Sequence, residues 1–437
     1  MWPRSPNDAI RSGADDDPRC WQLTFTVPQQ QTFVIVGASL AGAKAAESLR
    51  EAGFEGQVVL IGQEIHRPYE RLPLSKGYLK GTDAPDAFYI HAEDWYVTHN
   101  VELRLGTIVA AIHRDAHEVE LADGSRQRYD KLLLATGSIA RRIPNTDHDG
   151  VFYLRRVEDF DRLREAFSRQ ARVVLVGGGW IGLEVAAAAR HHGCPVTMVE
   201  PSKAPLGRRF GPGVGAMFAE LHRDHGVDVR LGVNVNEVRP GPVVVTSTGE
   251  EIAADVVVIG VGHRPATELA EAAGLEVDDG IRVTSELQTT RDPDIYAAGA
   301  CVRADHPLYV RPIRVEHWDT ALTGGVAAAR SMLGKGEPYD RVPYFYSVQY
   351  DLRLECSGWV DPGSFAEVVF RGDRDRREFV AFWLDGESRV LAGMNVNGPD
   401  VTNPIDAIEK MVRSRRPIDP TRLVDTTVPL EELIPNG

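Results

Sequence analysis

The chain has few cysteines, and they are spread widely. Its 437 residues contain only Cys20, Cys194, Cys301 and Cys356, and no two of them form a C-x-x-C pair. This spacing lacks the usual pattern of a zinc site, an internal iron–sulfur cluster or a redox-active dithiol. It indicates free thiols in a reducing compartment, so we expect a cytoplasmic protein without a metal site.

Long apolar runs and an excess of positive charge are also missing. No stretch approaches the ~20 apolar residues that a membrane-spanning helix needs, so we expect no membrane partner. Lys and Arg number 49 against 63 Asp and Glu, which gives a formal net charge of −14. Most of such a surface would repel phosphate, so we expect no nucleic-acid partner. Residues 1–31 lack the apolar core of a signal peptide and are expected to form a mobile tail.

The chain does contain two glycine-rich turns, each between an apolar strand and an alanine-rich helix. The first spans 37–42 after FVIV, and the second spans 177–182 after VVLV. A second apolar strand follows each helix, which predicts two βαβ units that hold a dinucleotide pyrophosphate on the helix N-terminus. The expected contacts are Gly37, Ser39, Leu40, Ala41 and Gly42 in the first turn, and Gly177, Gly179, Trp180, Ile181 and Gly182 in the second.

Three polar side chains qualify this prediction. Ser39 stands where a glycine is usual, although its small hydroxyl could itself donate to a phosphate oxygen. Glu64 and Glu200, near the ends of the second strands, are placed to accept hydrogen bonds from adenosine ribose hydroxyls. Because a carboxylate repels a 2′-phosphate, Glu200 predicts NADH rather than NADPH at the second site, although Lys203, Arg208 and Arg209 nearby could offset the repulsion.

The order of the segments predicts the domains. Two more apolar strands, at 131–137 and 255–262, bracket the second unit, as expected for a domain inserted in another. The region after Pro343 reads as an antiparallel meander. We therefore predict an α/β fold with a tail, two Rossmann-like domains and a small C-terminal α+β domain. The predicted bounds are 1–31 for the tail, 32–142 with 263–335 for the first nucleotide domain, 143–262 for the second and 336–437 for the last.

Several motifs point to a known family. The segment RPYERLPLSK at 67–76 closely resembles a signature of FAD-dependent, NADH-dependent ferredoxin reductases. Further strings follow in that family's order, from about Phe33 into the C-terminal region. They are ATG at 135–137, GGGWIGLE at 177–184, GVGHRP at 260–265, DIYAAG at 294–299, VEHW at 315–318 and PYFYS at 343–347.

The resemblance implies a glutathione-reductase-like flavoprotein architecture and a reaction. In that family a hydride passes from NADH to FAD, and single electrons then pass to a small iron–sulfur ferredoxin. Such an external acceptor suits a chain without cluster-forming cysteines. By resemblance, Lys76 and Glu184 pair beside the flavin, and Trp318 lies near its ring. Resemblance also adds FAD contacts from Arg71, Ala135, Thr136, Gly137, Gly299, Ala300 and His317, and an NADH contact from Gly262.

The chain departs from the family pattern at Ala300. The family reads AAGDC there, and its aspartate accepts a hydrogen bond from the ribityl chain of FAD, whereas this chain reads AAGAC. Losing one such acceptor costs roughly 1–3 kcal/mol, so we expect FAD binding to be on the order of tenfold to a hundredfold weaker. Val348 and Gly398 depart from the pattern in the C-terminal region.

Some questions stay open at this point. A ferredoxin is usually acidic, so a local cluster from Arg303, Arg311, Arg314 and Arg353 is expected to receive it. The same fold could instead reduce a quinone, oxygen or a small organic oxidant. A third reading, from Ala300 and Ser39, is a flavin-poor protein that binds nucleotides as a signal. The sequence leaves the oligomeric state open.

Overall fold

The first glycine turn opens from a five-stranded parallel sheet. A computed structural model describes residues 30–84, 86–398 and 404–434, so almost all of the predicted tail 1–31 lies outside the described residues. Val34 pairs with Val59 on one side and with Leu132 on the other. The strands are short runs of buried Val, Ile and Leu, as a sheet covered on both faces requires. Their order is β19 (Ile295–Ala297), β7 (Lys131–Leu134), β1 (Thr32–Val36), β2 (Gln57–Ile61) and β3 (Val101–Arg104).

A second parallel sheet of five strands carries the second glycine turn. Its central strand pairs through Val174 with Thr197 and with Val257. The order is β12 (Val227–Leu231), β11 (Val196–Glu200), β10 (Val173–Val176), β16 (Val256–Ile259) and β9 (Val151–Phe152). Its helices are α3 (Val157–Ser168), α4 (Trp180–His191), α5 (Gly207–Phe210) and α6 (Pro212–Asp224).

The chain returns to the first sheet after the second. Strand β17 (His263–Pro265) pairs with β8 (Ser138–Ala140), and β19 then lies beside β7. Two separate nucleotide-binding sheets confirm the predicted fold class, while the exact bounds at 142 and 263 stay predictions. The smaller elements are β4 (Val109–His113), β5 (Glu118–Leu121), β6 (Arg126–Arg128), β13 (Val235–Arg239), β14 (Val243–Thr246), β15 (Glu251–Ala253), β18 (Ile281–Val283), β20 (Val302–His306), β21 (Arg311–Ile313), α2 (Trp95–Thr98) and α7 (Glu268–Ala272).

The C-terminal region forms an antiparallel sheet, as its alternating pattern predicts. Trp383 is fully buried and donates its indole N–H to the Phe210 carbonyl at 3.1 Å, so this sheet shares a core with the second nucleotide sheet. The strand order is β22 (Tyr344–Gln349), β23 (Leu352–Gly358), β26 (Val390–Val396), β25 (Glu378–Leu384) and β24 (Glu367–Asp373). Helices α9 (Pro404–Ser414) and α10 (Pro420–Val424) follow. Among the described residues, we find no helix long and apolar enough to cross a bilayer.

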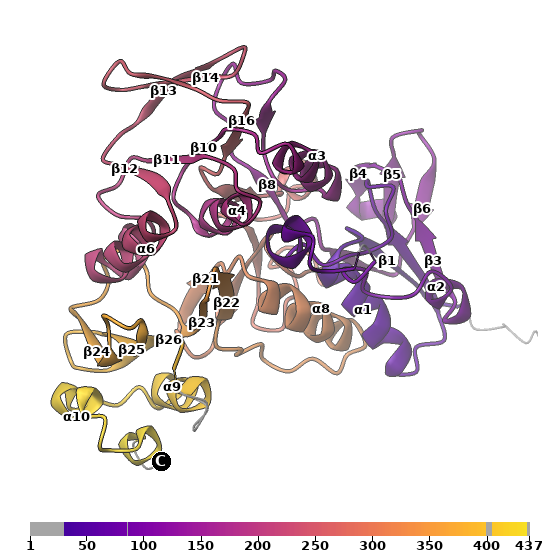
Figure 1. Cartoon of the computed structure of the whole chain (residues 1–437). Helices are drawn as coiled ribbons and strands as arrows, with labels where there is room; N and C mark the ends of the chain where they lie inside the picture. Colours follow the sequence, from indigo (N-terminus) through magenta and orange to yellow (C-terminus); the bar gives the residue numbers. More distant parts are fainter. Residues whose placement is uncertain (1–29, 85, 399–403, 435–437) are drawn as a thin grey trace, which may run out of the picture. The chain divides into compact units, whose positions relative to one another are not determined.

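Helices α1 (Leu40–Glu51) and α8 (Trp318–Met332) lie side by side against the first sheet (Figure 1). Their close approach depends on Gly325 of α8, where an added Cβ would lie 2.2 Å from the Ala41 carbonyl oxygen. At the adjacent Gly324 the nearest such atom is the Gly299 nitrogen at 3.7 Å, an ordinary contact. The position of the α1 N-terminus therefore rests on one glycine and not on its neighbour.

We predict opposite effects for the two glycines. Gly325→Ala should destabilise the protein by about 1–3 kcal/mol, because α8 must move away from α1. The control Gly324→Ala should be neutral or stabilising by up to about 1 kcal/mol, since alanine favours a helix. Thermal unfolding followed by circular dichroism measures both, and equal melting temperatures would contradict the packing role of Gly325.

Candidate functional site

The first glycine turn borders a large cleft. A cavity of about 1130 Å³ lies at the carboxyl ends of β1 and β7, where the order of the first sheet reverses, and open α/β sheets bind ligands at such points. It exceeds the roughly 300–1,000 Å³ of most small-molecule sites, as an extended dinucleotide would require. Of the predicted contacts, Gly37, Ser39, Glu64, Arg71, Ala135 and Thr136 line the cleft.

The backbone at this turn is held tightly. Gly37 has φ of +118°, and a Cβ there would lie 2.1 Å from the Ala135 carbonyl oxygen, so only glycine fits. Helix α1 begins at Leu40, and its first intrahelical bond runs from the Ala43 N–H to the Ser39 carbonyl. The preceding amides have no partner within the helix and are available to an anion. Ser39 Oγ lies 3.4 Å from the Tyr69 carbonyl, so its hydroxyl is already oriented.

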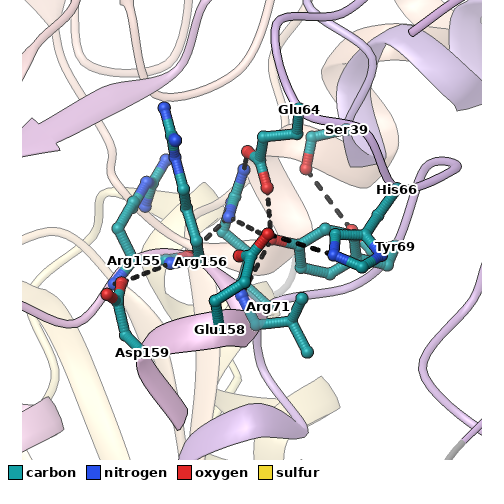
Figure 2. Close-up of polar contacts among 10 residues, drawn as sticks. Ser39, Glu64, His66, Tyr69, Arg71, Arg155, Arg156, Glu158 and Asp159 are labelled. Carbon is teal, nitrogen blue, oxygen red and sulfur yellow. Dashed lines mark hydrogen bonds and ion pairs between the residues drawn. The ribbon is translucent and has the colours of Figure 1, made fainter. Parts of the chain in front are cut away.

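Glu64 is tied to neighbours that the sequence prediction did not connect (Figure 2). Arg71 Nη2 and the Tyr69 hydroxyl each donate to one carboxylate oxygen at 2.5 Å, and Arg71 Nη1 also donates to the Tyr69 oxygen at 2.9 Å. Burial alone would raise the pKa of Glu64, but the Arg71 charge and these hydrogen bonds outweigh it and lower the pKa below its usual value. Glu64 is therefore a fixed anion at the edge of the cleft.

Five arginines that line the cleft were not predicted from the sequence: Arg141, Arg142, Arg155, Arg156 and Arg264. Arg155 Nη2 would lie 3.1 Å from a Cβ at Gly137. Burial and the neighbouring Arg71 lower the pKa of Arg155 to about 10, so it stays charged at neutral pH. Arg141 comes shortly after ATG at 135–137, a motif that the prediction used. Arg155 lies in the segment between β9 and α3, and only the tertiary structure brings it to the first cleft.

The second glycine turn repeats the geometry of the first. Gly177 has φ of +107°, and a Cβ at Gly182 would lie 2.4 Å from the Gly177 carbonyl oxygen. Helix α4 begins after Gly179, whose carbonyl accepts the first intrahelical bond from Leu183 N–H. Glu200 accepts the amides of Gly178 at 2.6 Å and of Ser202 at 2.8 Å. Its carboxylate is thus fixed beside the turn, and its contact with a ribose stays a prediction.

Two of the remaining predicted contacts of the second site, Trp180 and Ile181, have side chains that pack in the apolar core. The Trp180 ring packs against Phe345, Phe210 and Phe218, with centroids at 5.0, 5.7 and 5.5 Å. Ile181 packs against the same apolar core, so these two residues can offer backbone amides while their side chains support the helix. Gly262 has φ of +97°, and Arg208 lies in the short helix α5.

Lys76 and Glu184 form a buried ion pair between the two nucleotide domains. Lys76 Nζ lies 2.8 Å from both carboxylate oxygens, and the two residues are 9% and 5% exposed. Lys76 interrupts a short π-helical turn, η1 (Leu74–Tyr78), with φ and ψ of −111° and −112°, and such irregular turns are frequent at functional sites. The structure therefore brings together the two residues that the resemblance paired.

Aromatic residues surround this pair. Tyr346 places its ring 5.6 Å from Lys76 Nζ and in edge contact with Trp318, whose centroid lies 6.3 Å away. The Trp318 indole donates to Glu70 at 2.8 Å, while the His317 ring stacks on Phe345 with centroids 4.7 Å apart. The predicted catalytic residues Lys76, Glu184 and Trp318 thus share one neighbourhood, and Glu70 and Tyr346 were not predicted.

The AAGAC segment lies against the first helix. Gly299 has φ of +82°, and a Cβ there would lie 3.2 Å from the Ala41 Cβ. It also lines a small separate cavity of about 30 Å³. Ala300 follows Gly299 directly in the loop after β19 and so lies one residue from this contact with α1.

Three of the four arginines in the predicted cluster, Arg303, Arg311 and Arg314, are paired with neighbouring acids. Arg303 pairs with Asp278 at 3.0 Å, and Arg311 pairs with Asp361. Arg314 lies between two acids, Asp279 at 3.2 Å and Glu316 at 3.0 Å, and its side chain is 16% exposed. These pairs reduce the positive charge that the cluster offers to an acidic partner, so its role as a docking patch stays a prediction.

Two parallel sheets with a glycine turn each, and a buried lysine and glutamate between them, define a protein with two dinucleotide sites. Comparison with protein families agrees: the pyridine nucleotide-disulphide oxidoreductase family matches residues 31–325, and a reductase C-terminal domain matches 344–434. The chain belongs to the pyridine nucleotide-disulphide oxidoreductase family. The described cysteines Cys194, Cys301 and Cys356 are free and buried, so none of them forms a disulfide pair.

Individual relatives cover nearly the whole chain. The ferredoxin–NAD(+) reductase component of the anthranilate 1,2-dioxygenase system of Burkholderia cepacia is 39% identical, over 92% of this chain and 99% of that one. Putidaredoxin reductase of Pseudomonas putida is 37% identical, over 92% and 96%. The solved covalent complex of putidaredoxin reductase with putidaredoxin superposes with a TM-score of 0.87 at 37% identity, covering 92% of this chain and 98% of that chain.

The buried pair predicts non-additive stability effects. Lys76→Met should lower the free energy of unfolding by about 3 kcal/mol, because it leaves the Glu184 carboxylate buried without its cation. The double variant with Glu184→Gln should lose about 1–3 kcal/mol less than the sum of the two single variants. Chemical denaturation of all four proteins measures this coupling.

A surface pair provides the control for that cycle. Arg239 and Glu251 are 2.7 Å apart with 44% and 59% of their side chains exposed, so Arg239→Met should cost no more than about 1 kcal/mol. Strictly additive losses for Lys76 and Glu184 would mean that the two side chains are not coupled in solution.

Proposed function

We propose that the chain is an FAD-dependent NADH:ferredoxin reductase that transfers a hydride from NADH to FAD and then single electrons to a small iron–sulfur ferredoxin. The observation that carries this proposal is the buried Lys76–Glu184 pair, which joins the turn η1 to α4, the helix that follows the second glycine turn. The names of the relatives support it, since they describe ferredoxin–NAD(+) reductases and a putidaredoxin reductase.

The first cleft fits FAD. At Gly37 a Cβ would collide with the Ala135 carbonyl oxygen, so glycine is required for the tight turn that leads into α1, whose N-terminal amides can hold a pyrophosphate. Arg155 and Arg71 supply positive charge, and Glu64 supplies an acceptor for ribose hydroxyls. When bound, FAD would accept a hydride and release electrons one at a time. The residues we assign to it are Gly37, Ser39, Leu40, Ala41, Gly42, Glu64, Arg71, Ala135, Thr136, Gly137, Arg141, Arg155, Gly299, Ala300, His317 and Trp318.

The second turn fits NADH. The N-terminus of α4 offers amides for a pyrophosphate, and the Glu200 carboxylate beside Gly178 would repel the additional phosphate of NADPH. Arg208 lies in the following helix α5 and could offset that repulsion. We therefore assign Gly177, Gly179, Trp180, Ile181, Gly182, Glu200 and Gly262 to NADH.

Lys76 and Glu184 act at the junction of the two sites in this proposal. A fixed ammonium beside the reducible end of the flavin ring would stabilise negative charge that develops there on reduction. Glu184 holds the ammonium in place through both of its carboxylate oxygens. Trp318, oriented by Glu70, contributes an aromatic face beside Tyr346, whose ring lies near Lys76. The buried and free thiols described here fit the cytoplasmic location that we propose.

The leading test is an anaerobic spectrum. The purified protein, or the protein reconstituted with FAD, should show the visible flavin band and lose it on addition of NADH, and more slowly with NADPH. Oxidised ferredoxin should then restore the band and transfer electrons on to cytochrome c. A colourless protein that does not take up FAD would support the nucleotide-responsive alternative, and faster oxidation by a quinone than by any ferredoxin would support the small-acceptor alternative.

Ala300 yields a second prediction. Ala300→Asp should tighten FAD binding by about tenfold to a hundredfold, because the new carboxylate can accept a charge-assisted hydrogen bond. Ala300→Asn is the matched control, since it has the same size without the charge and should tighten binding less. FAD dissociation constants measured by fluorescence on dilution distinguish the variants, and an unchanged constant for Ala300→Asp would contradict the assignment of this loop.

A further inference from the structure

A chain of buried polar side chains leads away from Glu184 toward the surface of α6. Ser347 Oγ donates to Glu184 Oε1 at 2.6 Å, and Gln349 Nε2 donates to Ser347 Oγ at 3.2 Å. His222 Nε2 lies 3.0 Å from Gln349 Oε1, and the Tyr350 hydroxyl lies 3.1 Å from His222 Nδ1. Ser347, Gln349 and His222 are each at most 1% exposed.

The chemistry of these groups allows only one direction of donation along this series of hydrogen bonds. Glu184 can only accept, so the Ser347 hydroxyl must donate to it and must therefore accept from Gln349. The Gln349 amide then turns its nitrogen to Ser347 and its oxygen to His222. His222 must carry its proton on Nε2, which leaves Nδ1 to accept from Tyr350. Every donor thus points toward the Glu184 carboxylate.

The neutral state of His222 agrees with this order. Burial lowers the pKa of His222 to about 4, although the hydrogen bond to Gln349 opposes the shift and nearby His225 adds to it. A neutral ring has one donor and one acceptor, which is what the chain needs at this position. The His225 ring stacks on Tyr350 with centroids 3.7 Å apart and closes the outer end.

The backbone at Tyr350 provides an independent observation. Tyr350 has φ of +54° in the two-residue turn between β22 and β23, a conformation that favours glycine in such turns. The turn holds a large aromatic residue in this conformation while its hydroxyl bonds to His222. Such strain at a residue with a specific polar contact points to a role for that contact.

We propose that Ser347, Gln349, His222 and Tyr350 are positioning residues that hold the Glu184 carboxylate, and through it the Lys76 ammonium, in a single geometry. This series of hydrogen bonds runs from α6 of the second nucleotide domain through β22 of the C-terminal domain to α4 and η1. It thereby makes the C-terminal domain part of the electron-transfer site. This inference deepens the function proposed above and rests on it only for the effect on the flavin.

The first test does not depend on the reaction. Nitrogen NMR of the full-length protein with isotope-labelled histidine should find His222 as the neutral Nε2–H tautomer. In Tyr350→Phe, which removes the donor to Nδ1, the resonances of this ring should shift toward those of a mixture of tautomers. An Nδ1–H tautomer in the unchanged protein would overturn the proposal, because Gln349 would then be reversed and Ser347 could no longer donate to Glu184.

The second test measures the consequence at the flavin. In Tyr350→Phe and Ser347→Ala, the rate of flavin reduction by saturating NADH should fall by about threefold to tenfold, with KM for NADH changed less than twofold. The flavin midpoint potential should become more negative in the same variants. Ser347→Thr keeps the hydroxyl and should restore both values.

Tyr344→Phe is the matched control on the same strand. The Tyr344 hydroxyl donates to Glu355 at 2.6 Å and is not part of the series of hydrogen bonds that leads to Glu184. Its removal should leave the rate of flavin reduction, the flavin midpoint potential and the His222 tautomer unchanged. Identical behaviour of Tyr350→Phe and Tyr344→Phe would overturn the proposal. If the tautomer is as expected but no flavin is bound by the unchanged protein, the proposed function fails while the hydrogen-bond chain stands.

Discussion

The buried ion pair of Lys76 and Glu184 is the interaction on which the arrangement of the site depends. An unpaired charge in the interior costs several kcal/mol, so each partner requires the other, and their segments must meet. Lys76 comes from the irregular turn η1, Glu184 from helix α4, and their further hydrogen-bond partner Ser347 from strand β22. One pair thus joins parts of the chain that lie more than a hundred residues apart.

Backbone geometry determines the shape of the two glycine turns at the nucleotide sites. At Gly37 and Gly177 a side chain would collide with a neighbouring carbonyl oxygen, so the turn and the start of the helix are fixed together. Amides at a helix N-terminus attract phosphate without a charged side chain. Charged residues then adjust the sites, and they differ: Arg71 and Arg155 border the first, whereas Glu200 borders the second.

The acidic character of the chain bears on its electron acceptor. With a net charge of −14, an acidic ferredoxin would need a local basic surface. The arginines that the sequence suggested for it mostly serve internal pairs, such as Arg314 with Asp279 and Glu316. Sequence alone could not foresee this, because the acids are near these arginines in space and only some are near them along the chain.

The sequence by itself determined the fold class and the two glycine turns, because local periodicity and motifs with fixed spacing encode them. The pairing of Lys76 with Glu184 was expected only from the resemblance of their motifs to a known family. The tertiary structure alone decided which side chains from distant segments complete the site. Arg155 reaches the first cleft from the other domain, and His222 reaches Glu184 through Gln349 and Ser347. Such contacts depend on how sheets and helices pack, and no local pattern in the chain records that packing.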